Sequence, residues 1–205
     1  MIRTEDQFVW NFVGMMGFLA AGLLLGMVSL LVPGQGLLRA FGGVFVHLGV
    51  GHILSNLIMI LVIGLGLSAF AHPVEFGGIL LSATVVHTVM SYFFFPVVGL
   101  SLVLYAMIAT LIVYLCGIVF ELDHFGTIGT VALPVTGVLL LAVVLFLVSD
   151  QLLHDLAVVF EGQAVQIDNP IYTRGSSFAH VIGFLWGGMA AVGLRYARYR
   201  IFAIP

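Results

Sequence analysis

The sequence predicts an all-α protein that crosses a membrane several times. Of its 205 residues, 62% are hydrophobic and only 7% are charged, whereas soluble domains carry about 25% charged residues. Long uncharged runs recur along the chain, and a helix needs about 20 apolar residues to cross the hydrocarbon core. These runs are continuous rather than short and alternating, which excludes a membrane β-barrel. We therefore expect a polytopic bundle of helices.

Six membrane-spanning helices follow from the uncharged runs. The longest run, 76–120, is divided near Pro96 and Gly99, because proline interrupts a helix and glycine permits a turn. The predicted helices are 9–32, 44–70, 76–95, 99–120, 127–149 and 177–197. Together they form a single membrane domain over residues 1–205.

Arginines near the helix ends predict the orientation of this domain. Arg195, Arg198 and Arg200 crowd the end of the last helix, and basic residues favour the cytoplasmic side. With six spans, both termini are then cytoplasmic in a multi-pass protein of the cell membrane. Two of the outer loops are 33–43, which is short, and 150–176. An interfacial helix and a solvated connector are both compatible with the second loop.

Composition also excludes several functions. Six basic residues stand against nine acidic ones without a basic patch, so nucleic-acid binding is not expected. A transporter or channel would need paired ionisable residues deep in the bundle, and no acidic residue lies inside a predicted span. The chain has no H-E-x-x-H motif and no acidic residue near the histidines of the spans, so we expect neither a metal nor a cofactor.

Polar side chains inside the predicted spans are the candidate functional residues, because such groups are costly in lipid. Four of them share one depth in the outer half of the membrane: His52, Asn56, Ser101 and His180. His52 and Asn56 are four residues apart and face the same way. His47 is rotated away from His52 by about 140°. We expect His87, in the third span, to make a structural hydrogen bond.

Small residues predict that the helices of Ser101 and His180 touch. Gly183 and Gly187 form a ridge that lets another helix approach closely, and Tyr105 stands one turn after Ser101. A serine and a histidine on touching helices can act as nucleophile and base. Spacing alone leaves an alternative open, in which the serine bonds its own helix and the histidine fills an interhelical contact.

The order of these residues resembles that of the rhomboid family of intramembrane serine proteases. Residues 47–56 resemble its H-x4-H-x3-N pattern, 99–106 its G-x-S-G-x-x-x-[AG] segment, and 179–187 its A-H-x-x-G-x-x-x-G segment. The resemblance covers residues 9–197 and implies a six-helix rhomboid-like bundle.

The resemblance also implies roles for the candidate residues. By the motif match, Ser101 is the nucleophile, His180 is the base, and His52 and Asn56 stabilise the oxyanion. The implied activity is cleavage of transmembrane segments of membrane proteins near the outer face of the bilayer. It requires neither a cofactor nor a metal ion.

Two further positions match the family, and one departs from it. Tyr105 and Gly183 match residues that pack the dyad, whereas Leu102 replaces the glycine that follows the nucleophile. We expect this larger side chain to displace the neighbouring helix outward while the dyad persists. The alternative function is that of a catalytically inactive rhomboid-like protein that binds membrane helices.

Overall fold

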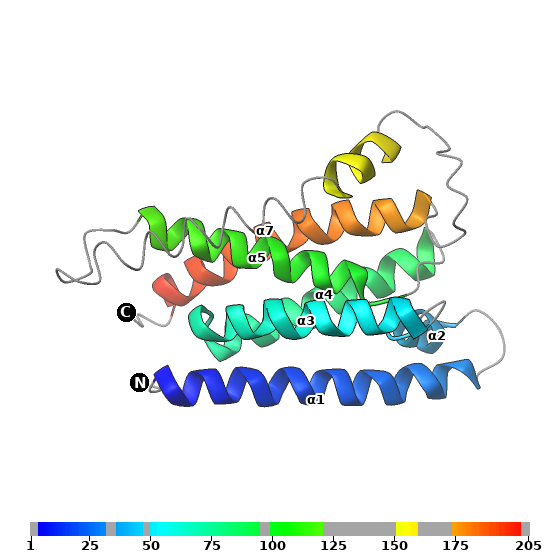
Figure 1. Ribbon diagram of the computed structural model, residues 1–205, viewed down its shortest axis with the longest axis horizontal. Coiled ribbons are helices and arrows are strands. Elements are labelled where there is room, and N and C mark those ends of the chain that lie inside the picture. Colours follow the sequence, from blue (N-terminus) through cyan, green and yellow to red (C-terminus); the bar gives the residue numbers. More distant parts are fainter. Residues whose placement is uncertain are drawn as a thin grey trace.

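The computed structural model shows a bundle of α-helices (Figure 1). It describes residues 4–31, 36–46, 50–94, 99–120, 151–159 and 174–201. The helices are α1 (Thr4–Leu30), α2 (Leu37–Gly43), α3 (Val50–Phe70), α4 (Pro73–Phe93), α5 (Ser101–Phe120) and α7 (Arg174–Ile201). Residues 151–159 are helical as well, and none of the described residues lies in a strand. The predicted all-α class is therefore confirmed.

The described helices include four that are long and apolar enough to cross a membrane, namely Asp6–Leu30, Val50–Phe70, Pro73–Phe93 and Ser177–Ala197. A shorter apolar helix covers Ser101–Gly117. Large apolar side chains such as Leu24, Ile58 and Val192 are exposed on the outside of the bundle, as expected for helices that face lipid. The chain is thus a multi-pass membrane protein. The predicted span 127–149 lies outside the described residues.

The loop predicted over 33–43 contains a helix instead. Residues 37–43 form α2, and the chain turns at Val44 and Phe45, so α3 begins at Val50 rather than at the predicted residue 44. Phe45 packs edge-on against Phe18 of α1, with ring centroids 5.4 Å apart. Its ring also fills the space beside Gly22, where a Cβ atom would clash with it. Small residues on α1 therefore make room for the end of α2.

The beginning of α4 is fixed by a capping box. The ring of His72 accepts a hydrogen bond from the backbone of Val74, and the Glu75 carboxylate accepts one from the backbone of His72 at 3.0 Å. Pro73 occupies the first helical position, where its missing N–H costs nothing. These contacts start α4 at residue 73, before the predicted 76.

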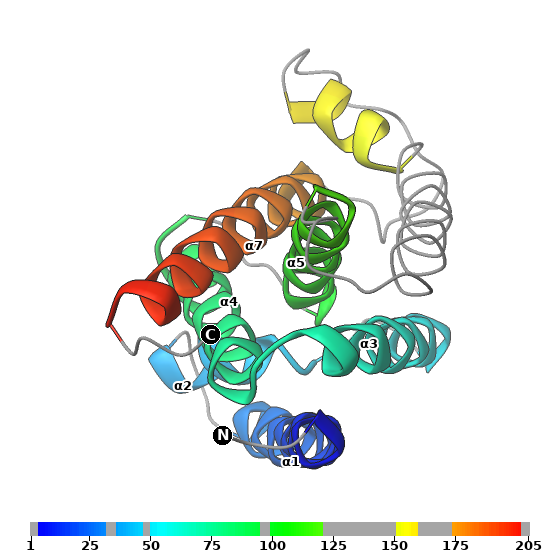
Figure 2. The same cartoon turned by 90° about the vertical axis from the view of Figure 1, so that its left-hand side faces the viewer.

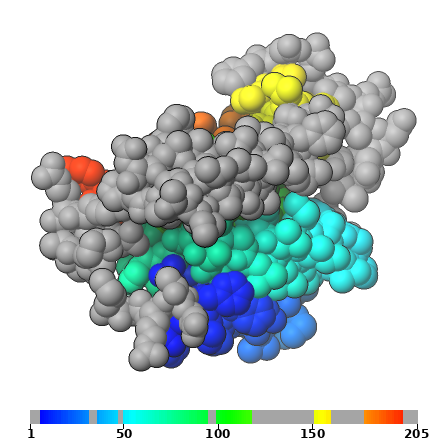
Figure 3. All heavy atoms as spheres, turned by 60° about the vertical axis from the view of Figure 1, so that its left-hand side comes forward, coloured from blue at the N-terminus to red at the C-terminus, as the bar shows by residue number. Residues whose placement is uncertain are grey.

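The polar side chains of α1 hold the turn between α3 and α4. Gln7 and Asn11 each donate a side-chain hydrogen bond to the carbonyl of Ala71, both at 2.8 Å. The last carbonyl groups of a helix have no partner within it, so these donors stabilise the end of α3. Figure 3 shows the surface of α1, in blue, beside that of α3, in cyan.

The helices define two ends of the bundle. α1 begins and α7 ends at one end, called here the terminal end, whereas α2 lies at the opposite end, the α2 end (Figure 1). α5 packs against α3, α4 and α7 (Figure 2). Every residue of 101–111 is buried. The first half of α5 is therefore enclosed by protein, and this is where the candidate serine lies.

Candidate active site

α5 and α7 touch along their backbones. A Cβ atom on Gly183 would lie 2.4 Å from the carbonyl oxygen of Leu102, and one on Gly187 would lie 2.1 Å from that of Ala106. Both distances are too short for any side chain, so the contact requires glycine at both positions. The hydroxyl of Thr110 adds a hydrogen bond to the carbonyl of Gly187 at 3.2 Å. The structure thus brings the serine helix and the histidine helix together.

The ring of His180 stacks on the ring of Tyr105. Their centroids are 4.4 Å apart and their planes differ by 9°, and both residues are buried. Ser101, the first residue of α5, lies one helical turn before Tyr105 on the same face. Ser101 and His180 therefore lie at the same level of the α5–α7 contact, although no hydrogen bond joins these two described residues.

Glycine places the start of α5. Gly99 has a φ of 105°, a left-handed conformation that glycine adopts without strain. Its backbone N–H donates a hydrogen bond to the carbonyl of Gly43 at 2.9 Å. The end of α2 is thereby tied to the residues that lead into Ser101.

α3 brings the other two predicted site residues toward the same region. Asn56 is buried and His52 is half-buried. α3, which carries both residues, packs against α5. The hydroxyl of Ser55 bonds back to the His52 carbonyl at 3.0 Å and does not enter the site. His47 lies outside the described residues, and His87 is fully buried in α4.

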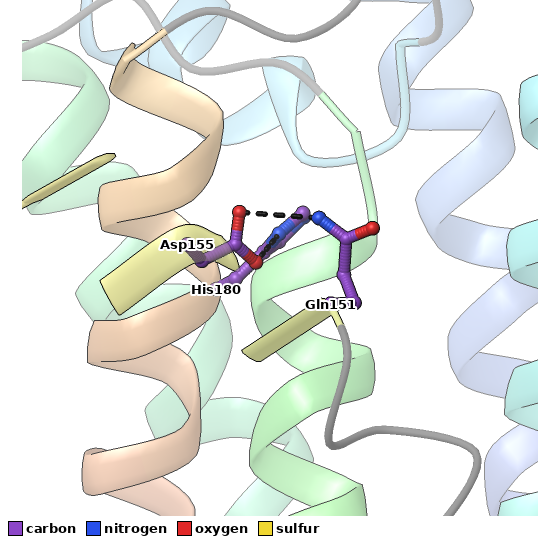
Figure 4. Close-up of polar contacts among 3 residues, drawn as sticks. All are labelled: Gln151, Asp155 and His180. Carbon is purple, nitrogen blue, oxygen red and sulfur yellow. Dashed lines mark hydrogen bonds and ion pairs between the residues drawn. The ribbon is translucent and has the colours of Figure 1, made fainter. Parts of the chain in front are cut away.

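One residue beside the candidate base was missed by the sequence analysis. Asp155, in the helical segment 151–159, is fully buried, and its Oδ2 atom lies 2.7 Å from Nδ1 of His180 (Figure 4). Its Oδ1 atom accepts a hydrogen bond from the Gln151 amide at 3.2 Å. The expectation that no acidic residue lies near these histidines is therefore wrong, because this segment packs its carboxylate against α7.

The segment 151–159 also decides between the two alternatives for the predicted loop 150–176. It is a short helix rather than a solvated connector over these residues. The four-residue spacing of Gln151 and Asp155 fits a helical pair and was a signal available in the sequence. The contact of Asp155 with His180 joins residues 25 positions apart in the sequence, and no local sequence pattern predicts it.

Leu102 does not displace α7. Its side chain is fully buried in the hydrophobic core, while its carbonyl oxygen faces Gly183 of α7. The room for the contact comes from the missing side chain of Gly183, so a glycine on α5 is not needed. The expected outward displacement is therefore wrong.

Metal binding requires several ligands in one place. No group of three or more His, Cys, Asp and Glu side chains able to hold a metal ion occurs in the described part of the chain. The ring of His180 and the carboxylate of Asp155 instead bond to each other.

Fold and site together define a multi-pass helical membrane protein with a buried polar cluster between α5, α7 and the segment 151–159. A family model described as the Rhomboid domain matches residues 34–197, which is most of the chain. The chain therefore belongs to the rhomboid family, which comprises intramembrane serine proteases and inactive relatives. No curated protein and no solved structure gave a match.

Proposed function

We propose that this protein is an intramembrane serine endopeptidase with Ser101 as nucleophile and His180 as base. The observation that carries the proposal is the stacking of His180 on Tyr105, one turn from Ser101. His180 takes the hydroxyl proton as Ser101 attacks the scissile carbonyl, and then gives it to the leaving amine. Water hydrolyses the acyl-enzyme by the same route.

The proposal assigns oxyanion stabilisation to α3. His52 and Asn56 are four residues apart on this helix and can both donate hydrogen bonds toward a developing negative charge. The burial of Asn56, on a helix that packs against α5, supports this assignment. Donors held in place before the reaction need no reorganisation when the charge appears.

The proposed substrates are transmembrane segments of other membrane proteins, cleaved near the outer face of the bilayer. A helical segment hides its carbonyls in backbone hydrogen bonds, so it must unwind locally before Ser101 can attack. The α2 end is proposed to face outward and both termini to be cytoplasmic, because Arg195, Arg198 and Arg200 lie near the end of α7. Reporter fusions to the two termini test this orientation.

Labelling with a serine-reactive fluorophosphonate tests the nucleophile. We expect the detergent-purified protein to be labelled, and Ser101→Ala to abolish labelling and substrate cleavage together. Ser68→Ala is the matched control, because Ser68 is also a buried helical serine, bonded to the carbonyl of Gly64 at 2.7 Å. Labelling that persists in Ser101→Ala removes the assigned nucleophile.

An inactive relative that binds membrane helices is the second candidate. The missing hydrogen bond between Ser101 and His180, both described residues, favours it. Catalytic hydrogen bonds are, however, often long in ligand-free enzymes and tighten only with substrate. A folded wild type that is inert toward both the probe and helical substrates would establish this second function.

A further inference from the structure

Asp155 places a fully buried carboxylate against the ring of His180. A carboxylate taken out of water is strongly destabilised unless it is paired and hydrogen-bonded. Here one oxygen faces Nδ1 of His180 at 2.7 Å, and the other accepts from Gln151 at 3.2 Å (Figure 4). With Asp155 ionised, the contact with His180 is a charge-assisted hydrogen bond.

This bond determines which ring nitrogen carries the proton. An ionised carboxylate can only accept hydrogen bonds, so Nδ1 of His180 must donate to Asp155. In a neutral imidazole, Nε2 is then the acceptor. Nε2 is the nitrogen that remains to take a proton from Ser101.

Tyr105 and Asp155 constrain the ring in different ways. Stacking at an interplanar angle of 9° fixes the plane of the His180 ring. A half-turn about the Cβ–Cγ bond would keep the ring parallel to Tyr105 and exchange the places of Nδ1 and Cδ2. Only a directional hydrogen bond, such as that to Asp155, distinguishes these two orientations.

We propose that Asp155 is a positioning residue for His180, which holds the ring in the orientation and tautomer that a general base requires. The inference rests on the proposed function. Asp155 acts through His180 and is assigned no contact with substrate. The segment 151–159 would thereby complete a carboxylate–imidazole–hydroxyl series whose other members lie on α7 and α5.

Two substitutions separate this role from a purely structural one. Asp155→Asn keeps the size of the side chain but replaces the charge with an amide that can donate to Nδ1. Asp155→Glu keeps the charge and changes the length. A positioning carboxylate predicts more activity in the Glu variant than in the Asn variant, whereas simple packing of the segment predicts the reverse.

We expect Asp155→Asn to lower kcat about 10³–10⁴-fold with little change in KM, as loss of the carboxylate does in soluble serine proteases. The Tm of the variant in detergent should stay close to that of the wild type. Leu153→Asn is the matched control, because Leu153 lies on the same segment with 64% of its surface exposed. We expect this control to leave kcat unchanged.

Nitrogen NMR of the histidine side chains supplies a readout that does not depend on turnover. In a Ser101→Ala background, the proton of neutral His180 should reside on Nδ1, and Asp155→Asn should move it to Nε2. Asp155→Glu should restore the Nδ1 form.

The outcomes distinguish the two proposals. An active wild type whose Asn variant keeps kcat within about threefold overturns the role of Asp155 and leaves the protease function intact. An inert wild type overturns the protease function, and with it the assignment of His180 as a base. A His180 tautomer that is the same in wild type and Asn variant overturns the inference in either case.

Discussion

Two buried carboxylates lie toward opposite ends of the bundle and have different partners. Glu75, toward the terminal end, accepts hydrogen bonds from the backbone of His72 at 3.0 Å and from the hydroxyl of Tyr114. Asp155 accepts a hydrogen bond from the Gln151 amide, and its second oxygen lies 2.7 Å from Nδ1 of His180. Glu75 is 2% exposed and Asp155 is 0% exposed, so burial does not distinguish them.

The partners show what each carboxylate holds in place. Glu75 completes the capping box that starts α4 and joins this helix to α5 through Tyr114. Asp155 holds a side chain that can carry a proton, and it belongs to a segment outside the long helices. The partners of a buried carboxylate, rather than its burial, therefore indicate whether it stabilises the fold or positions a proton-carrying side chain.

Leu102→Gly should have the largest effect on stability, and it tests whether a residue beside the candidate nucleophile can be purely structural. The change empties a fully buried site, so we expect a loss of about 3–5 kcal/mol of stability from the cavity and the weaker helix propensity. We expect no gain in turnover, because α7 already contacts the backbone here. Thermal unfolding and cleavage assays in detergent measure the two quantities.

Leu185→Gly is the control for that change. Leu185 is 58% exposed on α7, so the same substitution should cost only about 1 kcal/mol of helix propensity. A strong rise in activity of Leu102→Gly over an inert wild type would contradict the expectation and favour the inactive relative.

Asn56→Ala should lower turnover about 10²–10³-fold while leaving substrate binding nearly intact, as expected for a lost oxyanion donor. Ser55→Ala is its control, because Ser55 is exposed and bonds only its own helix in the described structure. Separate measurement of kcat and KM on a transmembrane substrate checks this. Equal losses of binding and turnover would instead make Asn56 a structural residue like Glu75.

Glu75→Gln gives the smallest effect and compares the two carboxylates directly, since it is the same exchange as Asp155→Asn. Glutamine can replace glutamate in a capping box, and weaker neutral hydrogen bonds should cost about 1–2 kcal/mol of stability. We expect the labelling rate of the folded protein to stay at the wild-type value. A fall in labelling rate without a fall in Tm would show that Glu75, like Asp155, affects the candidate site rather than only the fold.

The positions of the long helices could be predicted because lipid imposes a simple rule on the sequence. Uncharged runs located α1, α3, α4, α5 and α7 to within a few residues, apart from the start of α3. That start was wrong because α2 is only seven residues long and spans Arg39. Its last four residues therefore lie in the same uncharged run as α3. Its position depends on packing against α1 through Phe45, which is not visible in a periodic pattern.

The candidate site was predicted where its geometry follows from one helix or from small residues. The glycines of α7 indicated the contact with α5, and the four-residue spacing placed Tyr105 beside Ser101. Asp155 could not be found in this way, because its contact with His180 depends on how the segment 151–159 packs against α7. The predicted displacement of α7 by Leu102 was wrong because the contact between α5 and α7 involves the carbonyl oxygen of Leu102 rather than its side chain.

The enclosure of α5 has a consequence for biogenesis. This helix leaves the ribosome before α7, yet its residues 101–111 are all buried in the finished protein. Until α7 arrives, the backbone beside Leu102 and Ala106 has no glycine partner, and the hydroxyl of Thr110 lacks its bond to Gly187. A chain halted before Arg174 would contain the proposed nucleophile, Ser101, but not the proposed base, His180. The order of synthesis would thus delay the proposed proteolytic activity until α7 has docked.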